Sequence, residues 1–308
     1  MRRSPVRHRL LVLGFHNVDS TWCWPSAAGE GVSTFLRHMK ILDRMANVVP
    51  LAQALDALAA GRALPPRAVA LTFDDGYRDN LTLAAPILHR FGMPATVYLV
   101  PHFLSGQEHA WWERLGWAVR QARASHLTFA GVRHPLSDPD ARITALRAVE
   151  DGVKDRTHAE RRDLVEQLVD QLRPSGDFAA DTLFLDWDSA RRLAGTGLSI
   201  GSHTLDHAIL ARESPQEQRR NLRESREILQ RELQVEVDTL AYPNGKRVDY
   251  DATTIEAARA AGYSYAVTTW GSPVAAGDPP YEIHRTLISP SMSGGRFAAK
   301  LVQQLLPI

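Results

Sequence analysis

The amino-acid sequence predicts an α/β protein built on a parallel sheet, either doubly wound or closed into a barrel. Short β-rich runs alternate with helical stretches along most of the 308 residues, the pattern of repeated strand–helix units. Glycine follows three of the helical stretches, at Gly92, Gly197 and Gly262, where a left-handed C-terminal cap favours it. Hydrophobic residues make up 44% of the chain and charged residues 23%, which is typical of a globular protein with a sizeable core.

The elements follow one another in a regular order. The predicted strands occupy residues 10–15, 68–73, 95–100, 198–201, 239–242, 264–268 and 284–288. Helical periodicity marks residues 51–60, 80–91, 187–194, 215–233 and 252–261 between them. The Pro- and Gly-containing stretch at 272–280 is expected to be a loop.

Residues 105–181 depart from this order. The stretch holds a Trp-Trp pair and then charged helical patterns at 138–151 and 158–172. We expect a helical insertion on the loop side of the sheet, within a single domain that spans residues 1–308.

Charge and hydropathy exclude several classes of protein. The 36 basic and 35 acidic residues argue against nucleic-acid binding, which normally needs a basic excess. No segment approaches the roughly 18 apolar residues of a membrane span. The arginines ahead of the apolar run LLVLGF, at Arg2, Arg3, Arg7 and Arg9, resemble a signal peptide, but that run is short and no small-residue cleavage site follows. We therefore expect a first strand there, and a cytoplasmic protein that can still associate peripherally with a membrane.

The motif LTFDDGY, residues 71–77, places two carboxylates directly after an apolar strand. Active sites of barrels and open α/β sheets lie at the carboxyl ends of strands, so Asp74 and Asp75 are candidates for chemistry. An ordinary Asp-Gly turn is the alternative interpretation.

The motif GSHTLDHAIL, residues 201–210, follows another predicted strand. His203 and His207 are four residues apart, which places both imidazoles on one face if the segment turns helically. With Asp75 they would form a set suited to a divalent metal, and Asp74 would remain free as a general base. Two surface histidines at this spacing by chance are the alternative, and Asp206 is expected to face solvent or to support a ligand.

The motif LAYPNG, residues 240–245, ends a third strand. Proline restricts both its own backbone and that of the residue before it, which would aim the Tyr242 backbone N–H at an oxyanion. A plain strand-to-loop turn explains these residues equally well.

The three motifs occur in an order similar to that of the polysaccharide deacetylases of carbohydrate esterase family 4, the NodB-homology group. The resemblance covers roughly residues 10–104 and 182–290, including LVLGFHNV and FGMPATVYLV as further strand segments. It implies a distorted (β/α)7 barrel. It also implies a metal-dependent hydrolase that removes acetyl groups from an N-acetylated, or less commonly O-acetylated, sugar or polysaccharide.

The resemblance also implies a role for each motif residue. Asp74 would be the catalytic base. Asp75, His203 and His207 would bind a divalent metal, most often Zn²⁺ and sometimes Co²⁺ or Ni²⁺. The backbone amide of Tyr242 would hold the oxyanion together with that metal.

Two features depart from the family pattern. The third motif often carries an arginine that pairs with the catalytic aspartate, but here the residues before Pro243 read TLAY. Relatives with an AYP-type motif often carry an arginine in a late strand, so Arg285 in YEIHRTLIS is the expected partner of Asp74. His284 is a candidate general acid; if it does not serve, the leaving-group proton must come from elsewhere.

Other residues are candidates for substrate binding. His16, at the end of the first strand, is expected to face the same rim as the motifs, although it could equally pack in the core. Trp111, Trp112 and Trp187 are candidate platforms on which sugar rings stack, with burial in the core as the alternative.

Four functions fit these patterns. The leading one is a deacetylase acting on an acetylated glycan or lipid-linked sugar, and a deacylase of a small non-sugar amide is the second. An iron-dependent oxygenase is the third, because two histidines and a carboxylate also suit that metal. A non-catalytic carbohydrate-binding protein is the fourth, since the usual arginine of the third motif is missing.

Overall fold

A computed structural model describes residues 9–25, 30–271 and 273–305 of the chain. Within these residues one large sheet has the strand order β10-β1-β3-β4-β7-β8-β9, with β2 paired to β3 and β11 paired to β1. The strands of this sheet are β1 (Arg9–Phe15), β2 (Asn47–Val48), β3 (Ala68–Phe73), β4 (Ala95–Leu99), β7 (Ser199–Ser202), β8 (Thr239–Ala241), β9 (Tyr265–Val267), β10 (Val274–Ala275) and β11 (Thr286–Leu287).

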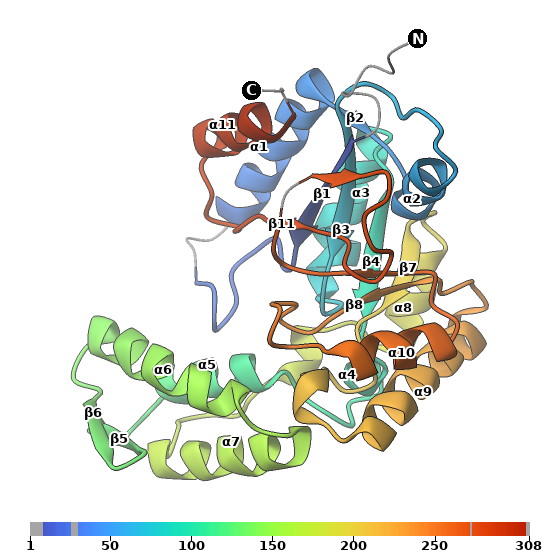
Figure 1. Cartoon of the computed structure of the whole chain (residues 1–308). Helices are drawn as coiled ribbons and strands as arrows, with labels where there is room; N and C mark the ends of the chain where they lie inside the picture. Colours follow the sequence, from blue (N-terminus) through green and yellow to red (C-terminus); the bar gives the residue numbers. More distant parts are fainter. Residues whose placement is uncertain (1–8, 26–29, 272, 306–308) are drawn as a thin grey trace.

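Helices cover the outside of this sheet (Figure 1). The α-helices are α1 (Glu30–Met45), α2 (Leu51–Ala59), α3 (Ala85–Arg90), α4 (Pro101–Leu104), α5 (Trp111–Arg120), α6 (Pro139–Lys154), α7 (His158–Leu172), α8 (Trp187–Ala194), α9 (Pro215–Leu233), α10 (Ala252–Ala260) and α11 (Gly294–Leu305). A π-helical turn at Asn80–Ala84 leads into α3.

Most of the sheet is parallel, and a late segment links its two ends. The pairs β1–β3, β3–β4, β4–β7, β7–β8 and β8–β9 are all parallel. Beyond β9, Ile283 bridges to Val267, while Thr286 pairs with Leu13 of β1. Residues 283–287 therefore lie between the last and the first strand, which confirms the distorted (β/α)7 barrel predicted from the family resemblance.

Each face of the first strand is buried in a different apolar cluster. Leu11 and Leu13 belong to the cluster between the sheet and its covering helices, whereas Leu10 and Val12 belong to a second cluster with α2. Burial on both faces explains why such strands appear in the sequence as continuous apolar runs. The run LLVLGF is thus a strand; Arg2, Arg3 and Arg7 lie outside the described residues.

The stretch 105–181 stands to one side of the barrel (Figure 1). It holds α5, α6 and α7 as expected from the sequence, together with a hairpin of β5 (His126–Phe129) and β6 (Val132–Pro135) that was not predicted. Its apolar side chains, such as Leu115, Val149 and Leu168, form a third cluster, which Tyr77 and Phe103 join from outside the stretch. That the whole chain is one domain stays a prediction. No helix among the described residues is both long and apolar enough to cross a membrane.

Candidate functional site

Polar side chains gather where the parallel strands end. Asp74 and Asp75 follow β3, and His203 follows β7. The N–H of Asp74 donates to the Phe15 carbonyl at 2.9 Å, and the N–H of His203 donates to the Leu99 carbonyl at 2.8 Å. The hydrogen bonds of the sheet therefore extend one residue past the strands and fix the backbone of these residues at one rim.

Asp75, His203 and His207 lie together as a group of possible metal ligands. Oδ1 of Asp75 is 3.4 Å from Nε2 of each histidine. Ligand atoms about 2.1 Å from a tetrahedral zinc ion are separated by about 3.4 Å, so this spacing leaves room for such an ion. All three residues are buried, and Oδ1 of Asp75 accepts no hydrogen bond from any residue the structure describes. The three side chains therefore fit a divalent cation.

Both histidines direct Nε2 toward Asp75. Burial would lower the pKa of His203, but the Asp75 and Asp74 carboxylates outweigh burial and raise it. Nδ1 of His203 lies 2.7 Å from the Ala241 carbonyl, which requires the proton on Nδ1 and leaves the Nε2 lone pair directed toward Asp75. Burial lowers the pKa of His207 to about 4, so its imidazole is uncharged at neutral pH.

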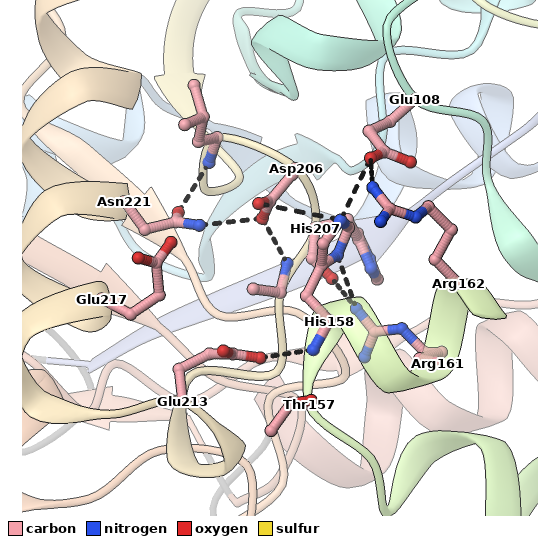
Figure 2. Close-up of polar contacts among 12 residues, drawn as sticks. Glu108, Thr157, His158, Arg161, Arg162, Asp206, His207, Glu213, Glu217 and Asn221 are labelled. Carbon is pink, nitrogen blue, oxygen red and sulfur yellow. Dashed lines mark hydrogen bonds and ion pairs between the residues drawn. The ribbon is translucent and has the colours of Figure 1, made fainter. Parts of the chain in front are cut away.

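The loop that carries the two histidines is held from helix α9. Asn221 accepts from the Leu205 N–H and donates to Oδ1 of Asp206, both at 2.8 Å (Figure 2). The same Asp206 oxygen accepts from the Ala208 N–H at 3.1 Å. Asp206 is buried and supports this loop. Of the two expectations for it, this matches the supporting role and not exposure to solvent.

Asp74 is clamped by Arg285. Nη1 and Nη2 of Arg285 donate to the two carboxylate oxygens of Asp74, each at 2.7 Å, and Nε donates to the Thr268 carbonyl at 2.9 Å. Burial alone would raise the pKa of Asp74, but the Arg285 guanidinium and His203 outweigh it and hold that pKa below its ordinary value. Asp74 is therefore a carboxylate at neutral pH, in a fixed orientation.

A cavity of about 850 Å³ opens over these residues. One side of it is formed by the barrel end, and the other by the β1–α1 loop and the stretch 105–181. Its lining includes His16, Trp24, Asp74, Asp75, Trp111, Trp112, Glu150, Asp151, Lys154, His203, His207, Arg212, Asn244, Lys246 and Asp249. The cavity thus makes these residues accessible to a ligand much larger than a water molecule.

Three predicted substrate contacts line this cavity. Nε2 of His16 lies 3.9 Å from Oδ2 of Asp74, and the His16 side chain is about one quarter exposed. The Trp112 ring is 4.5 Å from the His207 ring, centroid to centroid, and its Nε1–H donates to the Tyr77 hydroxyl at 2.8 Å. Trp111 also lines the cavity, although most of its surface is buried.

Comparison with known proteins identifies the family. A family model described as polysaccharide deacetylase matches residues 61–266, which is more than half of the chain. The chain belongs to this family. Among curated proteins, a putative polysaccharide deacetylase of Bacillus subtilis, YxkH, is 24% identical over 292 residues, 94% of this chain and 75% of its own length.

Solved structures of several deacetylases have a similar fold. The deacetylase PplD of Streptococcus pyogenes, solved in complex with acetate, aligns with a TM-score of 0.64 at 19% identity, covering 99% of this chain and 100% of that one. IcaB of Ammonifex degensii aligns with a TM-score of 0.59 at 19% identity, covering 96% and 97%. At these identities the likeness concerns the fold alone.

The backbone N–H of Tyr242 is not available for the role that was expected of it. Its N–H donates to the Val267 carbonyl at 3.2 Å, because the residue after β8 still pairs with β9. Its side chain is buried, with the hydroxyl donating to the Tyr281 carbonyl at 3.1 Å. The expectation that the Tyr242 N–H faces an oxyanion is therefore corrected: that N–H is already used in the sheet.

Two other candidates do not line the cavity. The ring of His284 packs against Trp270 at 4.4 Å between centroids, although it is the neighbour of Arg285. Trp187 begins helix α8 and packs against the main apolar cluster. The geometry gives no support to His284 as an acid or to Trp187 as a sugar platform.

Two residues that line the cavity were not predicted from the sequence. Asn244 lines the cavity in a left-handed conformation (φ 58°), and its N–H donates to no acceptor within residues 9–25, 30–271 and 273–305. Its Asn-Gly dipeptide, typical of a turn with positive φ, was the signal that could have found it. Trp24 lines the opposite side with 38% of its surface exposed, and no motif marks it.

Proposed function

We propose that this protein is a metal-dependent deacetylase that hydrolyses the acetamide of an N-acetylated sugar within a glycan or lipid-linked glycan. The observation that carries the proposal is the pair of neighbouring carboxylates in separate roles. Asp75 lies with His203 and His207, whereas Asp74 is bound by Arg285. A hydrolase needs both a metal set and a free base, and these four residues supply both.

Asp74 is the general base in this proposal. Arg285 keeps it ionised and oriented, so that a carboxylate oxygen can accept a proton from an attacking water. A divalent cation bound by Asp75, His203 and His207, with Zn²⁺ expected and Co²⁺ or Ni²⁺ as alternatives, would supply Lewis acidity at the acetyl oxygen and acidify the water.

Asn244 and His16 complete the proposed machinery. The N–H of Asn244 takes the place of the Tyr242 N–H as the donor to the developing oxyanion, because it borders the cavity and has no other acceptor among the described residues. His16 replaces His284 as the group that protonates the leaving amine, because it lines the cavity beside Asp74.

The substrate class rests on a local sequence match and on the cavity. The poly-β-1,6-N-acetyl-D-glucosamine N-deacetylase of Escherichia coli is 49% identical to this chain over 47 residues, 15% of this chain and 7% of that protein. A cavity of about 850 Å³ bordered by Trp24 and Trp112 suits more than one sugar ring. Cytoplasmic action on a precursor or lipid-linked sugar stays a prediction.

Acetate release tests the proposal. We expect wild-type protein to release acetate from at least one member of a panel of N- and O-acetylated oligosaccharides. A chelator should abolish the release, and added Zn²⁺ should restore it. Asp74→Asn should lower the rate at least 100-fold, because the base is lost while the metal ligands remain. Release that is insensitive to chelator, or unaffected by Asp74→Asn, would contradict the mechanism; glycan binding without any release would favour a carbohydrate-binding role.

A further inference from the structure

A cluster of buried and partly buried charged side chains joins the stretch 105–181 to the loop that carries His207 (Figure 2). Helix α7 contributes Arg161 and His158 to it, and the chain ahead of α5 contributes Glu108. The loop contributes Asp206 and the carbonyl of His207. None of the cluster's charged side chains is used by the proposed chemistry, although a metal-ligating residue lies inside it.

Arg161 is the most deeply buried member of this cluster. Only 2% of its surface is exposed, and none of the described carboxylates lies within ion-pair distance of it. Burial lowers the pKa of Arg161 to about 10, so the guanidinium is still charged at neutral pH. A buried charge without a direct counter-ion is unfavourable, and the carboxylates of Asp206, Glu213 and Glu108 offset only part of the cost of burying this one.

Arg161 donates from Nη2 to the carbonyl oxygen of His207 at 3.0 Å. The same Nη2 lies 3.3 Å from Nδ1 of His158, whose Nε2 lies 3.3 Å from Oε1 of Glu108. This arrangement gives His158 its proton on Nε2 and makes Nδ1 the acceptor. Glu108, in turn, orients His158 and thereby Arg161.

His207 needs support at this position because its backbone is in the left-handed region, with φ at 59°. Residues other than glycine adopt this conformation only when their surroundings hold them there. On one side, Asn221 and Asp206 hold the preceding and following N–H groups of the loop. On the other side, Arg161 holds the His207 carbonyl.

We propose that Arg161 is a positioning residue for the metal centre: through the His207 carbonyl, helix α7 fixes the backbone that aims the His207 imidazole at Asp75. The inference rests on the proposed metal-binding role of Asp75, His203 and His207. It makes the stretch 105–181 part of the metal site, although none of the three ligands comes from it. Partners outside the ligand set that orient a ligand typically contribute about 10- to 100-fold to metal affinity.

The test compares metal affinity in Arg161→Met and Arg142→Met. Arg142 on α6 is a matched control, because its guanidinium also donates to backbone carbonyls, but all of these lie within the stretch 105–181. They belong to Val119, Arg120, Ala122 and Leu136. Zn²⁺ dissociation constants are measured on metal-free protein by competition with a chromophoric chelator. The melting temperature of each metal-free variant is recorded alongside.

We expect Arg161→Met to weaken Zn²⁺ binding at least tenfold. Arg142→Met should lower the melting temperature but leave the dissociation constant within about twofold of wild type. The visible absorption of the Co²⁺-loaded protein should also change in Arg161→Met, because it reports the geometry of the ligands. Wild-type Zn²⁺ affinity in folded Arg161→Met, or an equal loss in Arg142→Met, would overturn the proposal.

Two further variants resolve the remaining cases. If Arg161→Met does not fold, Arg161→Lys decides, since a single ammonium cannot replace the guanidinium fork and should still weaken Zn²⁺ binding measurably; unchanged affinity overturns the proposal. Asp75→Asn tests the metal centre itself. If wild type binds no Zn²⁺, or Asp75→Asn binds it equally well, the metal centre and this inference fail together. If Asp75→Asn alone weakens binding, only the role of Arg161 fails.

Discussion

One side of the cavity consists of strand ends, whereas the opposite side consists of a loop and an inserted stretch. On the barrel side, Asp74 is locked by two hydrogen bonds to Arg285, and its N–H donates to the Phe15 carbonyl of the neighbouring strand. On the other side, the β1–α1 loop that carries Trp24 is attached mainly through single side chains. The proposed base and metal ligands lie on the barrel side, where geometry is fixed, whereas the proposed substrate contacts Trp24 and Trp112 lie on the other side.

Two carboxylates, one buried and one partly buried, attach the β1–α1 loop to the rest of the molecule. Oδ2 of Asp79 accepts from the N–H groups of Val18 and Asp19, at 2.7 and 2.9 Å. Glu113 of α5 accepts from the Cys23 N–H at 3.2 Å and from the Tyr77 hydroxyl at 2.9 Å. A few charged side chains thus hold the loop in place, whereas the backbone hydrogen bonds of a sheet hold the barrel side.

The largest effect is expected from breaking the buried pair on the barrel side. Arg285→Met leaves Asp74 as an unpaired buried charge, which should reduce the free energy of unfolding by about 3–5 kcal/mol. Urea denaturation measures this loss. Arg191→Met, which breaks solvent-accessible pairs with Asp188 and Glu232, is the control and should cost less than about 1 kcal/mol.

The double variant Asp74→Asn, Arg285→Met separates the charge from the packing. Removing both partners should restore a substantial part of the stability lost in Arg285→Met, because no buried charge is left unpaired. If the double variant is less stable than Arg285→Met alone, the two side chains contribute through packing, and the ion pair is not what fixes Asp74.

The rigid side was also the more predictable from sequence. Its strands are buried on both faces and therefore appear as apolar runs, as Ala68–Phe73 does. The predicted ligands each directly follow or closely follow a strand, so a local pattern placed them together. The partner assigned to Asp74 was likewise found in contact with it, since residues 283–287 close the barrel beside β1.

The site predictions failed where the role of a residue depends on a partner distant in the sequence or on the direction of its side chain. The N–H of Tyr242 is taken by Val267, a pairing that local sequence does not reveal. Along an extended segment successive side chains point to opposite sides, so Arg285 reaches Asp74 while its neighbour His284 turns toward Trp270. The β5–β6 hairpin turns at Ala130–Gly131, which lacks the Asn-Gly signal of such turns.

A smaller effect is expected from the pH dependence of the loop attachment. Burial raises the pKa of Asp79 from 3.8 to about 6, despite the two backbone N–H groups that favour its charged form. The folded state then binds this proton more tightly than the unfolded state. Asp79 therefore favours folding below pH 4, and the contribution is lost as the pH rises through about 6, by up to about 1.4 kcal/mol per pH unit.

Asp79→Asn removes this titration. The unfolding free energies of wild type and Asp79→Asn should be compared at pH 4.5, 5.5 and 7, at constant ionic strength. Wild-type stability relative to the variant should fall as the pH rises. A relative stability that rises with pH would mean that the N–H groups of Val18 and Asp19 outweigh burial and hold the carboxylate charged.

The smallest effect, and the one that tests the division between the two sides most directly, concerns Trp24. Its exposed ring borders the cavity, so Trp24→Ala should raise KM for an acetylated oligosaccharide roughly three- to tenfold, as expected for one lost stacking contact of about 0.5–1.5 kcal/mol. The ring lies 5.8 Å from the His16 ring, centroid to centroid, but takes no part in a proton transfer, so kcat should change less than KM does. Trp24→Phe should recover most of the affinity. Trp187→Phe, at a ring that packs outside the cavity, should leave KM unchanged; if it raises KM as much as Trp24→Ala does, substrate recognition extends beyond this cavity and the assignment of the two sides is wrong.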